Sequence, residues 1–263
     1  MQIIGQEKLL NILNAYLENN SLPTSLLFVG EKGCGKHTIA SYISSRLNID
    51  IVDISEQITE EYLIDRYISA NKNIYLLDFS SISIKKQNAL LKFIEEPPVN
   101  SYIIAICEDK SQVITTIQNR CQILTFDKYS KQQLENFTDN EYLLSVCKTP
   151  GRIINFQALS NIDIEYYRQL IKTILEKIYN ANIANILTIS NKVAFKEEES
   201  KDKLPIDLFL LMLKEETVSR VIAGQDLSNQ YVIIEKLFND CLIPHINKKY
   251  LFENFLIRLK YSK

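Results

Sequence analysis

The first half of the chain alternates short apolar runs with amphipathic segments. Over residues 7–17, apolar side chains recur at three- and four-residue spacings, which predicts a helix with one buried face. Residues 25–29 (SLLFV) form a continuous apolar run closed by Gly30, a pattern typical of a buried parallel strand. Residues 36–47 carry helical periodicity. This pattern predicts helix, strand, glycine loop and helix, in that order.

Further apolar runs continue the alternation. The runs at 74–77 and 102–107 predict two more buried strands, and 123–126 predicts a short one. Residues 84–95 are expected to form a helix, which Pro97–Pro98 cannot continue. Strands that alternate with helices imply right-handed crossovers and a mostly parallel sheet. The predicted fold class is α/β, with a parallel sheet and helices on both faces.

The pattern changes after about Lys128, where strand-like runs become scarce. Residues 162–178, 205–222 and 230–242 carry helical periodicity instead. A chain of 263 residues with 46% hydrophobic side chains favours two domains over one. We therefore expect an α/β domain followed by a helical region.

The charge and cysteine content limits the classes of function. With 30 Lys and Arg against 32 Asp and Glu, the net charge of -2 provides no overall positive field for nucleic acid, so any DNA contact must be local or made by partners. The 5 cysteines are scattered without a C-x-x-C pair, so no zinc site or disulfide framework is expected. No leader-like segment or membrane-length apolar run is found, which predicts a cytoplasmic location.

One motif carries recognisable chemistry. Residues 30–36 (GEKGCGK) fit the phosphate-loop pattern G-x-x-x-x-G-K between a predicted strand and a predicted helix. Glycines let backbone N–H groups turn inward to hold phosphates, and Lys36 would neutralise their charge. The candidate nucleotide-binding residues are Gly30, Gly33, Cys34, Gly35, Lys36, His37, Thr38 and Asp78.

Two positions of this candidate site differ from a hydrolysing enzyme. His37 stands where a Ser or Thr hydroxyl normally meets Mg²⁺, and Thr38 is rotated about 100 degrees around the helix. Asp78 ends a predicted strand, but Phe79 follows it where a second carboxylate would polarise the attacking water. We expect ATP hydrolysis to be lost. Whether the site still binds ATP or ADP weakly is left undecided by the sequence.

Residues 87–126 carry the most specific pattern. The stretch contains A-L-L-K-x-x-E-E-P-P, an apolar strand and T-I-x-x-R-C-Q-x-x-x-F. It resembles AAA+ clamp-loader subunits, and the retained Arg120–Cys121 pair without a catalytic Glu is most similar to the delta-prime type of bacterial DNA polymerase III. The resemblance implies an AAA+ domain at 1–128, a small helical lid at 129–160 and a helical collar at 161–263 that oligomerises.

The same resemblance assigns roles to individual residues. It implies that Arg120 is an arginine finger that acts on the ATP of a neighbouring subunit. Cys107 or Glu108 stands where a sensor Thr or Asn is usual, and Ile154 stands where the lid helix usually carries a second sensor Arg. For Arg152 a capping or surface role is the simpler interpretation.

The function implied is that of a non-hydrolysing subunit of a ring. Its expected partners are ATPase subunits, a delta-like subunit, the sliding clamp and primer–template DNA, and no cofactor or zinc is expected to be required. One alternative is an active clamp-loader ATPase that uses Thr38 for the metal. Another is a stand-alone DNA-binding AAA+ protein, against which the near-neutral charge counts.

Overall fold

The computed structural model describes residues 3–68, 71–159, 161–180, 182–195, 202–241 and 246–261. The chain forms two compact units. One comprises Met1–Leu134 with Thr149–Gly151, and the other comprises Glu135–Lys148 with Arg152–Lys263. The finer boundaries between an AAA+ domain, a lid and a collar stay predictions.

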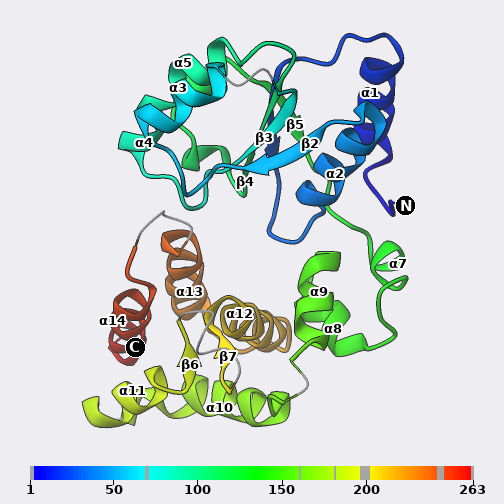
Figure 1. The fold of residues 1–263 in the computed structure, drawn as a ribbon. Helices are drawn as coiled ribbons and strands as arrows, with labels where there is room; N and C mark the ends of the chain where they lie inside the picture. Colours follow the sequence, from blue (N-terminus) through cyan, green and yellow to red (C-terminus); the bar gives the residue numbers. More distant parts are fainter. Residues whose placement is uncertain are drawn as a thin grey trace. The chain divides into compact units, whose positions relative to one another are not determined.

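The first unit is built on a five-stranded parallel sheet (Figure 1). The strands are β1 (Ser25–Val29), β2 (Asp50–Asp53), β3 (Asn73–Asp78), β4 (Tyr102–Cys107) and β5 (Gln122–Thr125). They lie in the order β2-β3-β4-β1-β5. Four strands confirm the predicted runs, whereas β2 was not predicted.

Helices cover both faces of this sheet. The helices of the first unit are α1 (Glu7–Glu18), α2 (Lys36–Leu47), α3 (Glu60–Ile68), α4 (Ile84–Ala89), α5 (Leu91–Glu95), α6 (Thr115–Gln118) and α7 (Lys131–Leu134), with a 3-10 turn η1 (Lys110–Gln112). One apolar core lies between the sheet and α1 and α2, and a second includes side chains of α3, α5 and α6. Leu26 and Phe28 of β1 enter the first core, and Leu27 and Val29 enter the second. The predicted α/β fold class is confirmed.

The helix expected over 84–95 is divided into α4 and α5 at Leu90. The backbone N–H of Leu90 is shared between the carbonyls of Lys86 (3.2 Å) and Gln87 (3.1 Å). Such sharing tightens one turn toward 3-10 geometry. The prediction of a single uninterrupted helix was therefore wrong at this residue.

The second unit is mainly helical. Its helices are α8 (Glu141–Val146), α9 (Pro150–Gln157, whose first two residues belong to the first unit), α10 (Ile164–Lys177), α11 (Ile183–Ser190), α12 (Ile206–Ile222), α13 (Ser228–Asp240) and α14 (Lys248–Lys260), with a 3-10 turn η2 (Ile178–Asn180). The three helical segments predicted from periodicity correspond to α10, α12 and α13. A two-residue parallel pair, β6 (Val193–Ala194) with β7 (Leu204–Pro205), departs from the all-helical expectation.

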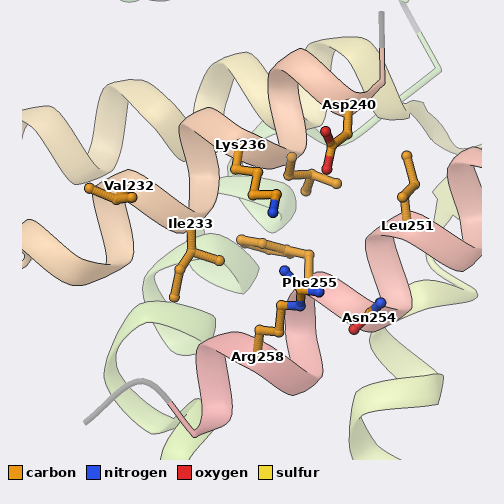
Figure 2. A pocket seen from close by; sticks show the side chains of 9 residues that line it. Val232, Ile233, Lys236, Asp240, Leu251, Asn254, Phe255 and Arg258 are labelled. Carbon is orange, nitrogen blue, oxygen red and sulfur yellow. The ribbon is translucent and has the colours of Figure 1, made fainter. Parts of the chain in front are cut away.

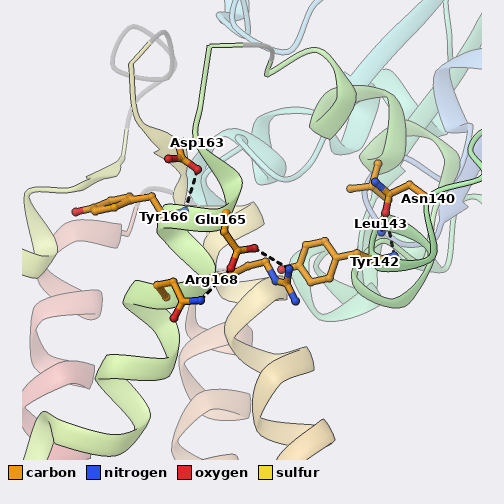
Figure 3. Close-up of polar contacts among 8 residues, drawn as sticks. Asn140, Tyr142, Leu143, Asp163, Glu165, Tyr166 and Arg168 are labelled. Carbon is orange, nitrogen blue, oxygen red and sulfur yellow. Dashed lines mark hydrogen bonds and ion pairs between the residues drawn. The ribbon is translucent and has the colours of Figure 1, made fainter.

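Local polar contacts fix the ends of these helices and join two of them (Figure 3). Asn140 and Asp163 accept backbone N–H groups at the starts of α8 and α10. Arg168 of α10 donates to Glu165 over 2.7 Å, and its guanidinium carbon lies 4.4 Å from the ring centroid of Tyr142 on α8. Burial raises the pKa of Tyr142 to about 12, so the ring stays neutral beside the cation. No helix in the described part of the chain is long and apolar enough to cross a membrane.

Candidate functional site

The phosphate loop connects the carboxyl end of β1 to the first turn of α2. The backbone N–H of Gly30 donates to the carbonyl of Cys107 at the end of β4 over 3.2 Å, which anchors the entry to the loop. Gly35 caps α2 with φ +99°, a left-handed conformation that a residue with a side chain rarely adopts. The glycine loop thus stands where sheets of this type bind ligands, beyond the carboxyl ends of the strands.

Lys36 is nearly enclosed by this loop. The residue is 8% exposed, and its Nζ donates to the carbonyls of Gly30 and of Glu31, the latter over 3.0 Å. The same atom lies 4.0 Å from Sγ of Cys34. Within the described residues no carboxylate forms an ion pair with Lys36. A buried cation balanced only by carbonyl dipoles fits an anionic phosphate.

Two thiols lie near this ammonium. Burial raises the pKa of Cys34, and burial raises the pKa of Cys107 to about 12, although Lys36 opposes both shifts. Both side chains are buried. They therefore stay protonated at neutral pH and do not neutralise Lys36.

The positions compared with metal-binding and water-activating residues lie at the start of α2 and at the end of β3. The side chain of His37 is exposed on the first turn of α2, and Thr38 is half-buried. Asp78 accepts the backbone N–H of Ser80 over 2.9 Å at the end of β3. Phe79 is fully buried in the core on the α3 side of the sheet. The residues present thus fit phosphate better than they fit a catalytic metal.

Three residues outside the phosphate loop donate hydrogen bonds to its backbone carbonyls. The sequence pattern did not predict these contacts. Oγ1 of Thr149 donates to the carbonyl of Lys32 over 2.8 Å, and the N–H of Gly151 donates to the carbonyl of Gly33 over 2.9 Å. A Cβ at Gly151 would lie 2.7 Å from Cα of Gly33, so only glycine fits. The hydroxyl of Tyr129 donates to the carbonyl of Cys34 over 3.0 Å.

Arg120 lies at the opposite end of the sheet from this loop. It precedes β5, in which Gln122 pairs with Leu26 of β1 and Thr125 pairs with Val29. Because the two strands are parallel, the start of β5 lies beside the start of β1, whereas the loop follows the other end. Three residue steps along a parallel strand cover about 10 Å. Arg120 is therefore separated from the phosphate loop of its own chain.

The side chain of Arg120 is held by two neighbours. Nε donates to Oε2 of Glu95 over 2.8 Å, and Nη1 donates to the carbonyl of Thr116 over 2.9 Å. The side chains of Arg120 and Glu95 are 34% and 56% exposed. Glu95 belongs to the E-E-P-P motif, but its contact with Arg120 was not foreseen.

The positions compared with sensor residues give one correction. Ile154 is 53% exposed on α9, and Cys107 is buried at the end of β4. Arg152, for which a capping or surface role was expected, is only 7% exposed, and its guanidinium carbon lies 5.9 Å from the ring centroid of Phe238. An aromatic ring at this distance can compensate part of the desolvation of the cation.

Comparisons with known proteins find similarity to DNA polymerase III subunits and to replication factor C small subunits over part of the chain. The model of the family described as "DNA polymerase III, delta subunit" matches residues 46–130. The replication factor C small subunit of Natronomonas pharaonis is 29% identical over 159 residues, which are 53% of this chain and 49% of that protein. The DNA polymerase III subunit gamma/tau of Mycoplasma genitalium is 27% identical over 52% of this chain and 29% of its own length. The chain thus spans about half or less of the length of these relatives.

A solved structure extends the likeness of the fold to nearly the whole chain. The DNA polymerase III gamma subunit-related protein of Thermotoga maritima has a TM-score of 0.52 and 11% sequence identity, over 96% of this chain and 99% of that one. At this identity the likeness concerns the fold alone. Together with the sequence matches, it confirms the resemblance of this chain to AAA+ clamp-loader subunits.

Proposed function

We propose that this chain is a non-hydrolysing clamp-loader subunit of the delta-prime type. It assembles with ATPase subunits and a delta-like subunit, and the ring loads a sliding clamp onto primed DNA. Its own contribution to the chemistry is Arg120, which acts in trans on nucleotide bound by a neighbouring subunit. The chain works in the cytoplasm.

The loss of hydrolysis is supported by the core packing around β3. Phe79 stands directly after Asp78, and its ring is fully buried. A water-polarising carboxylate at that position would need contact with a nucleotide and with solvent. The side chain present instead fills the second apolar core, so the position serves packing.

Nucleotide binding is a separate property. The backbone of the loop and the enclosed Lys36 suit phosphate, and retention of ATP or ADP without turnover is compatible with them. When bound, the nucleotide would supply negative charge that holds the loop and Lys36 in one arrangement. The loaded ring needs no zinc and no turnover at this site.

The observation that carries the proposal is the position of Arg120. Its guanidinium lies at the amino-end edge of the sheet, away from the loop of its own chain, and is partly exposed. A planar, permanently charged fork at a surface suits phosphate oxygens presented by another molecule. This separation favours action on a neighbour over action within the chain.

Co-expression with clamp-loader ATPase subunits of the same organism, followed by native mass spectrometry, tests the proposal. We expect a stable hetero-oligomer, and we expect no ATP turnover from the isolated chain. Absence of any complex would reject the subunit assignment. Steady hydrolysis by the isolated chain that disappears in Lys36→Ala would instead select the active ATPase.

A further inference from the structure

Every backbone carbonyl of the phosphate loop from position 30 to position 35 accepts a hydrogen bond. The ammonium of Lys36 donates to the first two of these carbonyls, and the N–H of Ile39 donates to the last one over 2.9 Å. The three carbonyls between them receive their donors from outside the loop, from Thr149, Gly151 and Tyr129. The chain itself therefore holds the conformation of the loop, and no carbonyl of the loop needs a ligand.

Two N–H groups of the loop, those of Gly33 and Gly35, donate to no residue that the structure describes. In a trans peptide unit, the N–H points opposite to the carbonyl of the preceding residue. The carbonyl of Lys32 therefore fixes the direction of the N–H of Gly33. In the same way, the carbonyl of Cys34 fixes the direction of the N–H of Gly35. Whatever holds these two carbonyls also orients the two available N–H donors.

Two hydroxyl groups of the same compact unit hold these carbonyls. Oγ1 of the buried Thr149 donates to the carbonyl of Lys32 over 2.8 Å, and the hydroxyl of Tyr129 donates to that of Cys34 over 3.0 Å. The ring of Tyr129 packs against Gly5, where an added Cβ would lie 2.8 Å from Cε1. Burial raises the pKa of Tyr129, so its hydroxyl stays protonated and keeps donating at neutral pH.

We propose that Thr149 and Tyr129 are positioning residues for the phosphates of a nucleotide. Each holds one carbonyl of the loop and thereby directs one N–H, that of Gly33 or of Gly35, to the opposite side, while Lys36 supplies the positive charge. Two donors fixed in advance reduce the conformational freedom that the loop loses on binding, which strengthens the binding of phosphate. The inference rests on the retention of nucleotide at this site, which is part of the proposed function.

Removal of single hydroxyl groups tests the inference. Thr149→Val and Tyr129→Phe nearly keep the size of each side chain and delete only the donor. Each should weaken the binding of pyrophosphate to the full chain by about threefold to tenfold in isothermal titration calorimetry, the equivalent of one hydrogen bond. Tyr67→Phe is the matched control, because it removes a hydroxyl that donates over 2.9 Å to the carbonyl of Glu96, outside the loop. The control should bind within about twofold of wild type.

Binding of pyrophosphate elsewhere needs a second control. Lys236 and Arg258 line a groove between α13 and α14, where two cations could attract an anion (Figure 2). Pyrophosphate bound in this groove would not depend on Thr149 or Tyr129. Lys236→Ala/Arg258→Ala should therefore leave the affinity within about twofold of wild type, and a loss as large as that of Thr149→Val would contradict binding at the loop.

Glycine amide signals in NMR spectra separate positioning from general stability. Selective isotope labelling of glycine limits the spectrum to the 6 glycines of the chain. In wild type, pyrophosphate should shift the amide signals of Gly33 and Gly35. Thr149→Val should reduce mainly the shift at Gly33, and Tyr129→Phe should reduce mainly the shift at Gly35. A general loss of stability would not produce this crossed pattern.

Four results would overturn the inference. They are the absence of any shift at Gly33 and Gly35 in wild type, unchanged affinity of both variants, an equal loss of affinity in Tyr67→Phe, and equal reduction of both shifts by either substitution. Assembly with ATPase subunits tests the proposed function separately. If the ring assembles but Thr149→Val and Tyr129→Phe bind pyrophosphate as wild type does, the positioning role alone is wrong. If the crossed pattern is found but no ring forms, the proposed function is wrong instead.

Discussion

Arg120 and Glu95 form a hydrogen-bonded ion pair at the amino-end edge of the sheet, with 2.8 Å between Nε and Oε2. The second contact, from Nη1 of Arg120 to the carbonyl of Thr116, fixes another side of the guanidinium. Both bonds orient the planar fork while the side chain stays 34% exposed. Since the two residues are 25 positions apart, the end of α5 and the turn after α6 must pack together to set this orientation.

This geometry makes Glu95 a positioning residue for Arg120. Glu95→Ala should change the free energy of unfolding by less than about 1 kcal/mol, because exposed ion pairs contribute little to stability. In the reconstituted complex, the same change should lower kcat of the stimulated ATPase roughly 3- to 30-fold with little change in KM, because the fork loses its orientation. Chemical denaturation and steady-state kinetics measure the two effects.

Glu96→Gln is the matched control for this variant. Glu96 is an exposed neighbouring carboxylate whose side chain makes no hydrogen bond or ion pair with a residue that the structure describes. Glu96→Gln should leave kcat and the free energy of unfolding near the wild-type values. Equal kinetic losses in both variants would contradict a specific role of Glu95.

Gly151 is expected to be intolerant of a side chain. Gly151→Ala would bring Cβ to 2.7 Å from Cα of Gly33 and to 3.0 Å from its carbonyl oxygen. Since backbone must move to relieve this overlap, we expect a loss of about 1–3 kcal/mol. Thermal or chemical unfolding measures the loss. Ile154→Ala, at an exposed position of the same helix, should stay within about 0.5 kcal/mol of wild type, and equal stability of the two variants would argue against the close packing.

Gln87 holds three backbone groups in the interior. Nε2 donates to the carbonyls of Ile82 (3.1 Å) and Gln112 (2.7 Å), and Oε1 accepts the N–H of Ile114 (2.9 Å). Gln87→Leu leaves these groups without partners, so we expect a loss of at least about 2 kcal/mol in the free energy of unfolding. Asn88→Ala removes an exposed amide from the same helix and should cost much less. If Gln87→Leu left the free energy of unfolding unchanged, water would have to replace the amide as the partner of these backbone groups.

Phe79→Glu alone should not restore hydrolysis. The substitution puts a carboxylate into a fully buried core position, which should cost several kcal/mol or expose the end of β3. His37 would still stand where a Ser or Thr hydroxyl normally binds Mg²⁺. Denaturation and an ATPase assay of the purified variant check both effects, with Phe79→Leu as the apolar control. Substantial turnover by a stable Phe79→Glu protein would show that His37 is not limiting.

An element can be predicted from the sequence when consecutive residues encode it, and not when it depends on pairing with a distant segment. β1, β4 and α2 have bounds identical to the predicted ones, because a buried strand or a glycine-bounded helix is encoded in consecutive residues. β2 reads Asp-Ile-Val-Asp at the edge of the sheet, with exposed ends, so it lacked the apolar run of an inner strand. β2 forms a strand because it pairs with β3, which is distant in sequence.

The candidate site divides in the same way. The phosphate loop is a continuous motif, so its residues were predicted together. The contact of Thr149 with Lys32 spans 117 positions and leaves no local pattern, and neither does the pair of Glu95 with Arg120. Such contacts depend on how elements pack, which periodicity does not encode.

The most direct test of the account is the stimulated ATPase rate of a ring reconstituted with Arg120→Ala. Because trans-acting arginines stabilise charge during phosphoryl transfer, turnover at the neighbouring site should fall at least about tenfold, while folding and assembly stay intact. Arg120→Lys should rescue poorly, since a point charge does not reproduce the fork. A fully assembled ring that hydrolyses ATP and loads clamps at the wild-type rate with Arg120→Ala would contradict the proposed role of this chain.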